Sequence, residues 1–265
     1  MNGLDVSVTW EKDGAVVRAV IERPRVHNAI DSGVMGRLEG LLEDLRSDRE
    51  LRVLVVRGAG GAFVSGGDLQ EFSRLVEFDE VAEMSGRMKA ILRGLEELDC
   101  WTVACINGDA YGGGCELAMA FDFRIASERA RLGFTQARFA IPPGWGGLTR
   151  LVELVGRPVA LKWLATAAVV DAPRAKRAGV IDEVVAAKDL DAHLEALSRR
   201  LAKLPRELTR VLKDGARRAV ELPRDEAMEK ELKPFCDLWV AEKHHRRVEE
   251  FLSGSRAGDD DNPEQ

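Results

Sequence analysis

The feature that most constrains the fold is a strand, glycine and helix pattern in the middle of the chain. Residues 101–106 (WTVACI) are an apolar run, NGDAYGGG follows, and CELAMAF then carries a single glutamate among apolar residues. Glycine loses more conformational entropy than any other residue in a regular element, so a triplet indicates positive φ or a close approach of backbone. The pattern predicts a buried strand, a tight turn and a helix that begins at glycine.

A second segment of this kind lies upstream. Residues 62–64 (AFV) lead into Ser65, Gly66 and Gly67, and Asp68 is a typical N-cap for a following helix. Free N–H groups and the positive end of the helix dipole point outward at a helix start, where they attract negative charge. Either segment alone is more often a simple turn. Together, their glycine N–H groups could converge on one oxygen.

The rest of the pattern predicts an α/β core followed by helices. Apolar and polar residues alternate on both sides of Asp13-Gly14, which predicts a β-hairpin. Further strands are expected at residues 52–57, 62–64, 101–106 and 123–126, and helices at 33–45, 81–98 and 115–120. From about residue 190 the strand patterns stop, and residues 190–201, 207–220 and 225–251 have helical patterns.

These patterns divide the chain into three parts. We expect a core over residues 1–190, a helical region over 191–253 and a disordered acidic tail over 254–265. The helical region carries apolar side chains such as Phe235, Leu238 and Trp239 that need a covering surface. That surface could be the core or a second subunit.

Composition excludes several classes of function. The net charge of −6 argues against nucleic-acid binding, and no apolar run approaches the length of a membrane span. The four cysteines form no CxxC pair and have no nearby histidine cluster, so neither a zinc site nor a disulfide framework is predicted. The amino terminus lacks the basic and apolar parts of a secretory signal, so we expect a cytoplasmic protein.

Five stretches and their order resemble the crotonase (enoyl-CoA hydratase/isomerase) superfamily. They are IERPRVHNAID, VLVVRGAGGAFVSGGDL, VACINGDAYGGGCELAMAFDFRIAS, IPPGWGGLTRLVELVGRPVALKWL and DAPRAKRAGVIDEVV. The resemblance covers nearly all of residues 1–190 and, more loosely, the helical region. It implies an α/β fold, a spiral of ββα units with a C-terminal helical trimerisation region. It also implies a homotrimer or dimer of trimers that acts on acyl-CoA in fatty acid metabolism, with no metal and no cofactor beyond the coenzyme A of the substrate.

The resemblance also implies roles for individual residues. The N–H groups of Gly67 and Gly113 would polarise the thioester carbonyl, and Glu116 matches the first of two catalytic carboxylates. Gln136 stands where the second carboxylate is expected. The residues expected to cradle coenzyme A are Arg25, Val26, Ala62, Ser65, Gly66 and Asp68. Asp68 and Asp122 are otherwise expected to be a helix cap and a structural acid, and Tyr111 a core residue.

Gln136 leaves three functions open. An amide cannot accept and return a proton as a carboxylate does, so hydration of a 2-enoyl-CoA would depend on Glu116 alone. We expect this hydratase-like lyase first. Decarboxylation of a methylmalonyl- or ethylmalonyl-CoA-type substrate is the alternative, because it needs only enolate stabilisation and a proton donor, and IPPGWGGLTRLVELVG resembles relatives with that activity. The second alternative is a family member that binds acyl-CoA without turnover.

Overall fold

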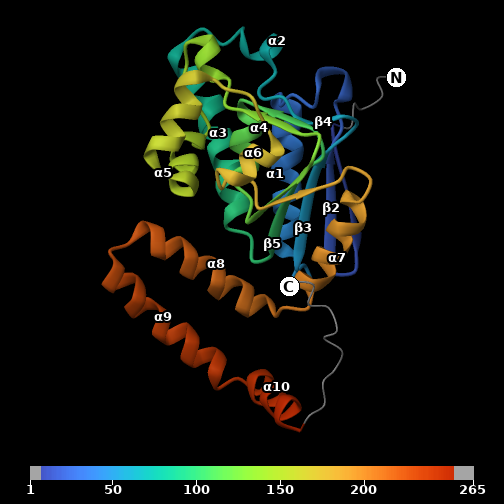
Figure 1. The fold of residues 1–265 in the computed structure, drawn as a ribbon, viewed down its shortest axis with the longest axis vertical. Helices are drawn as coiled ribbons and strands as arrows, with labels where there is room; N and C mark the ends of the chain where they lie inside the picture. The colour runs from blue at the N-terminus through green and yellow to red at the C-terminus, as the bar shows by residue number, and fades with distance from the viewer. Residues whose placement is uncertain (1–6, 254–265) are drawn as a thin grey trace. The chain divides into compact units, whose positions relative to one another are not determined.

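The computed structural model describes residues 7–253 of the chain, which falls into two compact units, residues 1–206 and 207–265 (Figure 1). The first unit holds both sheets and the residues of the predicted site. The predicted disorder of residues 254–265 lies outside the described residues.

The larger sheet of the first unit has the strand order β1-β2-β3-β5-β7-β10. Its strands are β1 (Val8–Asp13), β2 (Val16–Ile21), β3 (Val53–Gly58), β5 (Trp101–Ile106), β7 (Phe123–Ser127) and β10 (Glu183–Val185). β1 and β2 form the predicted antiparallel hairpin, in which Asp13 pairs with Val16 and Gly14 has φ 57°. The remaining neighbours are parallel, and β3 and β5 are mostly buried apolar runs, as expected for a sheet covered on both faces.

A smaller sheet contains β4 (Ala62–Val64), β6 (Asp109–Tyr111), β8 (Arg131–Gly133) and β9 (Val170–Asp171). β4, β6 and β8 pair in parallel, and each follows a strand of the larger sheet, namely β3, β5 and β7. The chain therefore repeats a step from the first sheet to the second, which is the expected spiral of ββα units. Strands β6, β8, β9 and β10 were not predicted, because two or three residues carry no periodicity.

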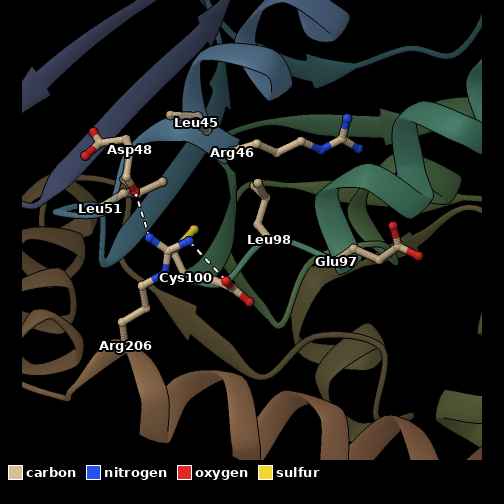
Figure 2. Close-up of a pocket in the computed structure, with 9 residues that line it drawn as sticks. Leu45, Arg46, Asp48, Leu51, Glu97, Leu98, Cys100 and Arg206 are labelled. Atoms are coloured by element: carbon tan, nitrogen blue, oxygen red, sulfur yellow. Dashed lines mark hydrogen bonds and ion pairs between the residues drawn. The ribbon is translucent and has the colours of Figure 1, made fainter.

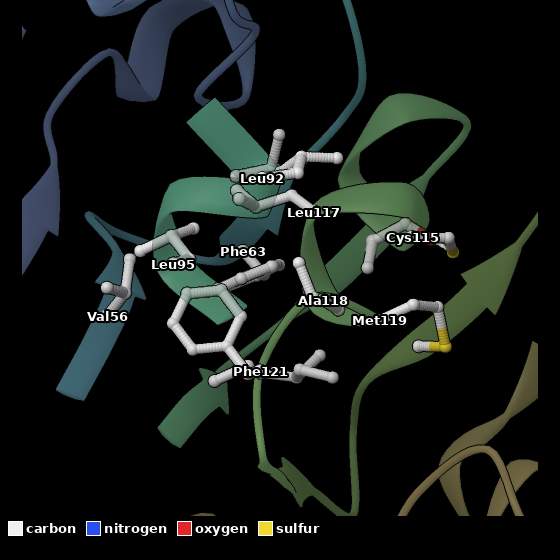
Figure 3. Close-up of a cluster of buried hydrophobic side chains, with 14 of the residues drawn as sticks. Val56, Phe63, Leu92, Leu95, Cys115, Leu117, Ala118, Met119 and Phe121 are labelled. Carbon is white, nitrogen blue, oxygen red and sulfur yellow. Dashed lines mark hydrogen bonds between the residues drawn. The ribbon is translucent and has the colours of Figure 1, made fainter. Parts of the chain in front are cut away.

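Helices cover the sheets and enclose the core. Those of the first unit are α1 (Ser32–Ser47), α2 (Leu69–Phe72), α3 (Phe78–Glu96), α4 (Gly113–Ala118), α5 (Gly147–Thr166), α6 (Ala172–Arg177) and α7 (Leu190–Ala202), with 3-10 turns η1 (Pro24–Val26) and η2 (Gln136–Phe139). Figure 3 shows Phe63 of β4 in one cluster with Leu92 and Leu95 of α3 and Leu117 and Ala118 of α4. This packing fixes α4 against β4, and both elements adjoin predicted oxyanion donors.

The core unit extends beyond the predicted boundary at residue 190. Leu190, Leu194, Leu197 and Leu201 of α7 are buried in a second apolar cluster with Val53 and Val55 of β3. Leu54 and Val56, the alternate residues of β3, belong to the main cluster, so α7 covers the other face of the sheet. The first unit therefore ends at Arg206.

The second unit is helical, as predicted. Its helices are α8 (Arg206–Glu221), α9 (Arg224–Trp239) and α10 (Glu242–Leu252). The first residue of α8, Arg206, still belongs to the first unit. The single helix expected over residues 225–251 is wrong, because Ala241 adopts an extended conformation between α9 and α10. None of the helices among residues 7–253 is long and apolar enough to span a membrane.

Candidate active site

Each glycine of the triplet at residues 112–114 has a separate structural reason. Gly112 has φ 50°, which turns the chain from β6 into α4. A Cβ on Gly113 would overlap the indole ring of Trp145, and one on Gly114 would overlap the carbonyl oxygen of Val64 in β4. The triplet therefore combines the two features expected of it, positive φ and close approach.

The two predicted oxyanion segments meet in the structure. Gly66 has φ 115°, and a Cβ built on it would lie 3.3 Å from the amide nitrogen of Gly113. Gly67 is held between two ladder bonds, in which Ile30 N donates to Gly66 O and Asp68 N donates to Ile30 O. Within residues 7–253, neither the N–H of Gly67 nor that of Gly113 donates to a protein acceptor. Both N–H groups are therefore available to bind a ligand.

Glu116 lies in the first turn of α4 and is only 2% exposed. Its Oε1 accepts from Gln136 Nε2 at 2.9 Å and Gly144 N at 3.2 Å. Its Oε2 accepts from Trp145 N at 2.7 Å and Gly147 N at 2.8 Å. These four donors match the roughly four acceptor positions of an ionised carboxylate.

Burial is the largest influence on the pKa of Glu116 and raises it above the ordinary value, although the hydrogen bonds from Gly147, Trp145, Gln136 and Gly144 oppose the shift. The sign for stability follows from the raised folded-state pKa. Glu116 contributes its full stabilisation below its ordinary pKa and loses that contribution as pH rises through the folded-state value. At the same time, its conjugate base becomes a stronger proton acceptor than an exposed glutamate.

Gln136 begins η2 and is 8% exposed, directly beside Glu116. While its Nε2 binds Glu116, its buried Oε1 has no hydrogen-bond partner among the described residues. The Gln136 amide also lies next to Gly112, because a Cβ on that glycine would be 4.0 Å from Nε2. The site thus contains one buried carboxylate and one buried oxygen that can accept a hydrogen bond.

A cavity of about 490 Å³ adjoins the two donor segments. It is lined by Pro24, His27, Ala59, Gly61, Ala62, Ser65, Asp109 and Tyr111. Ala62 and Ser65 were among the residues predicted to cradle coenzyme A, and Gly66 follows Ser65. Arg25 and Val26 are exposed on η1, between the lining residues Pro24 and His27.

The structure also shows the surroundings of three further residues with predicted roles, namely Asp68, Asp122 and Tyr111. Asp68 caps α2 by accepting from Gln70 N and Glu71 N, and it pairs with Arg23, so it does not line the cavity. Asp122 accepts from the amide and hydroxyl of Thr102, as a structural acid would. The expectation that Tyr111 is a core residue is wrong. It is half-buried, lines the cavity and donates to Asp109 Oδ2 at 2.7 Å.

Figure 2 shows residues that line a second cavity of the first unit, which measures about 90 Å³ and is lined by the end of α1, the segments that follow α1 and α3, and Arg206. Arg206 donates to Asp48 O and to Asp99 Oδ2 there. No predicted site residue lines this cavity. The described residues also contain no group of three or more His, Cys, Asp or Glu side chains placed to hold a metal ion.

The sequence analysis assigned no role to the loop that surrounds Glu116. Gly144, Trp145 and Gly147 supply three of the four hydrogen bonds to its carboxylate. The glycine-rich GWGG run, whose last glycine begins α5, could have signalled a loop leading into a helix, but no sequence pattern could reveal its partner. The contact is made across the fold.

The fold and the site define an α/β protein with two neighbouring glycine segments beside one buried carboxylate. A family model described as enoyl-CoA hydratase/isomerase matches residues 11–254, and the chain belongs to this family. The roles of the individual site residues stay predictions.

The relatives carry consistent names. The chain is 31% identical to a short-chain-enoyl-CoA hydratase of Clostridium acetobutylicum, across 93% of this chain and 94% of the relative. It is 29% identical to a crotonyl-CoA hydratase of Syntrophomonas wolfei, across 95% and 96%.

Solved structures agree with this assignment. An enoyl-CoA hydratase from Bacillus anthracis superposes with a TM-score of 0.89 at 26% identity, covering 94% of this chain and 96% of that one. An enoyl-CoA hydratase subunit from Geobacillus kaustophilus gives a TM-score of 0.87 at 32% identity, with the same coverage. The crotonase-like fold expected from the sequence is confirmed.

Proposed function

We propose that the protein hydrates a short 2-enoyl-CoA, with Glu116 as its one catalytic carboxylate. The observation that carries this proposal is the arrangement of the Gln136 amide. Its Nε2 binds Glu116 at 2.9 Å, while its buried Oε1 is left without a partner in the described structure. That oxygen can accept a hydrogen bond from a water molecule and so orient it beside the carboxylate.

The backbone donors supply the electrostatic part of the reaction. The N–H groups of Gly67 and Gly113 would both donate to the thioester oxygen, where negative charge develops as an enolate forms. Because the two amides are fixed by Gly66, Ile30 and the start of α4, they need no reorganisation during the reaction. Removing one such donor typically costs about 100- to 1,000-fold in kcat.

Glu116 would carry the proton transfers. Its ionised form takes a proton from the water, the water oxygen bonds to Cβ, and the C=C electrons move into the enolate. The protonated Glu116 then returns a proton to Cα, so one water adds across the double bond. The Gly144 contact is the longest of the four at 3.2 Å, and Oε1 is therefore the oxygen best able to exchange a donor for water.

Decarboxylation of a short malonyl-CoA-type substrate is the second candidate. The observation that favours it is the saturated state of Glu116, whose carboxylate already accepts four protein hydrogen bonds. Loss of CO2 from Cα leaves an enolate on the same two donors, and no water has to be activated. Only a proton is then required. Acyl-CoA binding without turnover is opposed by the unengaged donors and the raised pKa of Glu116.

The decisive experiment pairs Glu116→Gln with the unaltered protein. With crotonyl-CoA, we expect the variant to lose about 100-fold or more of the hydration rate, because an amide cannot shuttle a proton. The unaltered protein should lose activity on its acid limb at a pH above the ordinary glutamate pKa, since burial raises the pKa of Glu116. Enoyl absorbance measures hydration.

A parallel incubation with methylmalonyl-CoA, followed by CO2 release, separates the candidates. Hydration without CO2 release supports the hydratase. CO2 release with negligible hydration overturns it in favour of decarboxylation. Tight acyl-CoA binding with neither reaction supports the non-catalytic alternative.

We also propose the wider setting of this activity. The about 490 Å³ cavity would hold the coenzyme A part of the substrate, with no further cofactor. The free thiols of Cys105, Cys115 and Cys236 are consistent with a reducing compartment such as the cytoplasm. Large exposed apolar side chains on α8, α9 and α10 support assembly into trimers or pairs of trimers.

A further inference from the structure

Trp145 is a buried aromatic residue that packs directly on the two oxyanion glycines. Its side chain is among the core residues at 5% exposed. A Cβ on Gly113 would overlap ring carbon Cζ3, and a Cβ on Gly67 would lie 3.5 Å from Cζ2. One indole ring therefore lies beside both glycines whose amides would bind the thioester oxygen, and the Phe72 ring lies nearer still to Gly67, 2.8 Å from the same Cβ.

The ring lies where the acyl chain has to run. The about 490 Å³ cavity reaches the donor segments through Ser65 and Tyr111, and Trp145 is not among its lining residues. With coenzyme A on that side, the acyl carbons must extend from the carbonyl toward Glu116, which has to reach Cα. The backbone N–H of Trp145 donates to Glu116 Oε2 at 2.7 Å, so the residue that carries the indole is itself next to Glu116. The chain beyond Cβ would thus meet the indole.

Hydrogen bonds fix the loop that carries Trp145. The Trp145 carbonyl accepts from Arg150 Nη1 at 3.1 Å, and Arg150 is itself paired with Glu96 through Nε at 2.5 Å and Nη2 at 2.8 Å. The neighbouring Gly144 carbonyl accepts from Ser85 Oγ of α3 at 2.6 Å. These contacts fix the backbone that carries Trp145, and dense packing around the buried side chain holds the indole in place.

We infer that Trp145 closes the acyl end of the site and restricts the protein to short-chain acyl-CoA substrates. The inference rests on the proposed function for the identity of the reacting group. It does not depend on whether hydration or decarboxylation follows, because both start from an acyl-CoA held by Gly67 and Gly113. The substitution that tests it leaves the backbone N–H to Glu116 unchanged.

The test compares crotonyl-CoA with 2-octenoyl-CoA as substrates, and butyryl-CoA with octanoyl-CoA as non-reacting ligands. The unaltered protein should prefer the four-carbon compound in both series. In Trp145→Ala, the ratio of kcat/KM for the long over the short substrate should rise by about tenfold or more, since a few methylenes in a fitted pocket give discrimination of that size. Binding of octanoyl-CoA should tighten relative to butyryl-CoA.

Trp163→Ala is the matched control, because Trp163 of α5 is equally buried at 5% exposed and supplies none of the three atoms nearest to a Cβ on Gly67 or Gly113. Its chain-length ratio should stay at that of the unaltered protein. Trp145→Leu, which leaves a smaller void, serves if the alanine variant fails to fold as judged by thermal unfolding.

The outcomes separate the two proposals. If Trp145→Ala discriminates less between butyryl-CoA and octanoyl-CoA than the unaltered protein does, and the unaltered protein shows no hydration, this inference stands and the hydratase proposal falls. Equal affinity of the unaltered protein for butyryl- and octanoyl-CoA would overturn the inference. So would an unchanged ratio in a folded Trp145 variant.

Discussion

At the scale of single residues, the proposed chemistry depends on the pair formed by Glu116 and Gln136. They belong to different elements, α4 and η2, and meet through one hydrogen bond of 2.9 Å. A glutamine there can orient a water molecule and hold the carboxylate, but it cannot supply or take a proton. In the proposed reaction Glu116 therefore carries both proton transfers, and burial raises its pKa.

Introducing a second acid at position 136 tests whether the glutamine there leaves the proton transfers to Glu116 alone. We expect Gln136→Glu to raise the hydration rate with crotonyl-CoA, because two carboxylates about 3 Å apart share a proton, which is then available for Cα. Gln136→Met, which keeps the bulk and loses both polar atoms, should lower the rate. The added negative charge should also move the acid limb of kcat/KM to higher pH.

Initial rates across pH, with thermal unfolding as a check on folding, give the measurement. A rate in Gln136→Glu that equals or falls below that of the unaltered protein, with the fold intact, would contradict the assigned role of Gln136.

At the scale of elements, the site depends on how closely α4 approaches β4. Gly114 has no side chain because the Val64 carbonyl of β4 occupies the space that a Cβ would need. The same approach brings the Gly66-Gly67 segment after β4 to the start of α4. Gly114, which the close packing of α4 on β4 requires, therefore also influences the distance between the two predicted oxyanion donors.

Gly114→Ala should accordingly lower both stability and activity. We expect a loss of about 1–3 kcal/mol in the free energy of unfolding, the usual cost of overpacking a dense core. Gly40→Ala is the control, because Gly40 lies in α1 with nothing within 4 Å of its added Cβ, and it should gain up to about 1 kcal/mol. Urea unfolding of both variants measures the difference, and equal midpoints would refute the argument.

At the scale of the whole molecule, the helices of the second unit carry large exposed apolar side chains. Within α9, Leu232 is 66% exposed and Phe235 57% exposed. Large exposed apolar surfaces typically mark interfaces. The trimerisation implied by the resemblance stays a prediction, and these residues are where it can be tested.

Sedimentation velocity should detect an assembly of three or six chains for the unaltered protein. The double substitution Leu232→Ser and Phe235→Ser should shift it toward smaller species, since it removes apolar burial from the expected interface. Glu231→Ser on the same helix should leave the distribution unchanged. A monomer at micromolar concentration in the unaltered protein would disprove the prediction.

The sequence alone was enough for the parts of the fold that local patterns encode. The Asp13-Gly14 hairpin, strand β5 at residues 101–106 and the glycine-lined start of α4 follow from alternation, apolar runs and the special conformations of glycine. The resemblance added site roles for Glu116, Gln136, Gly67 and Gly113, and these roles stay predictions. The structure places Gln136 in hydrogen-bond contact with Glu116 and the Gly66-Gly67 segment beside Gly113.

Only the tertiary structure decided what surrounds these residues. The amides of Gly144, Trp145 and Gly147 bind Glu116, and the Trp145 ring covers both donor glycines. It also decided that α7 joins the core. The physical reason is that hydrogen-bond partners and buried faces are set by segments far apart along the chain, whereas periodicity and turn chemistry act between near neighbours.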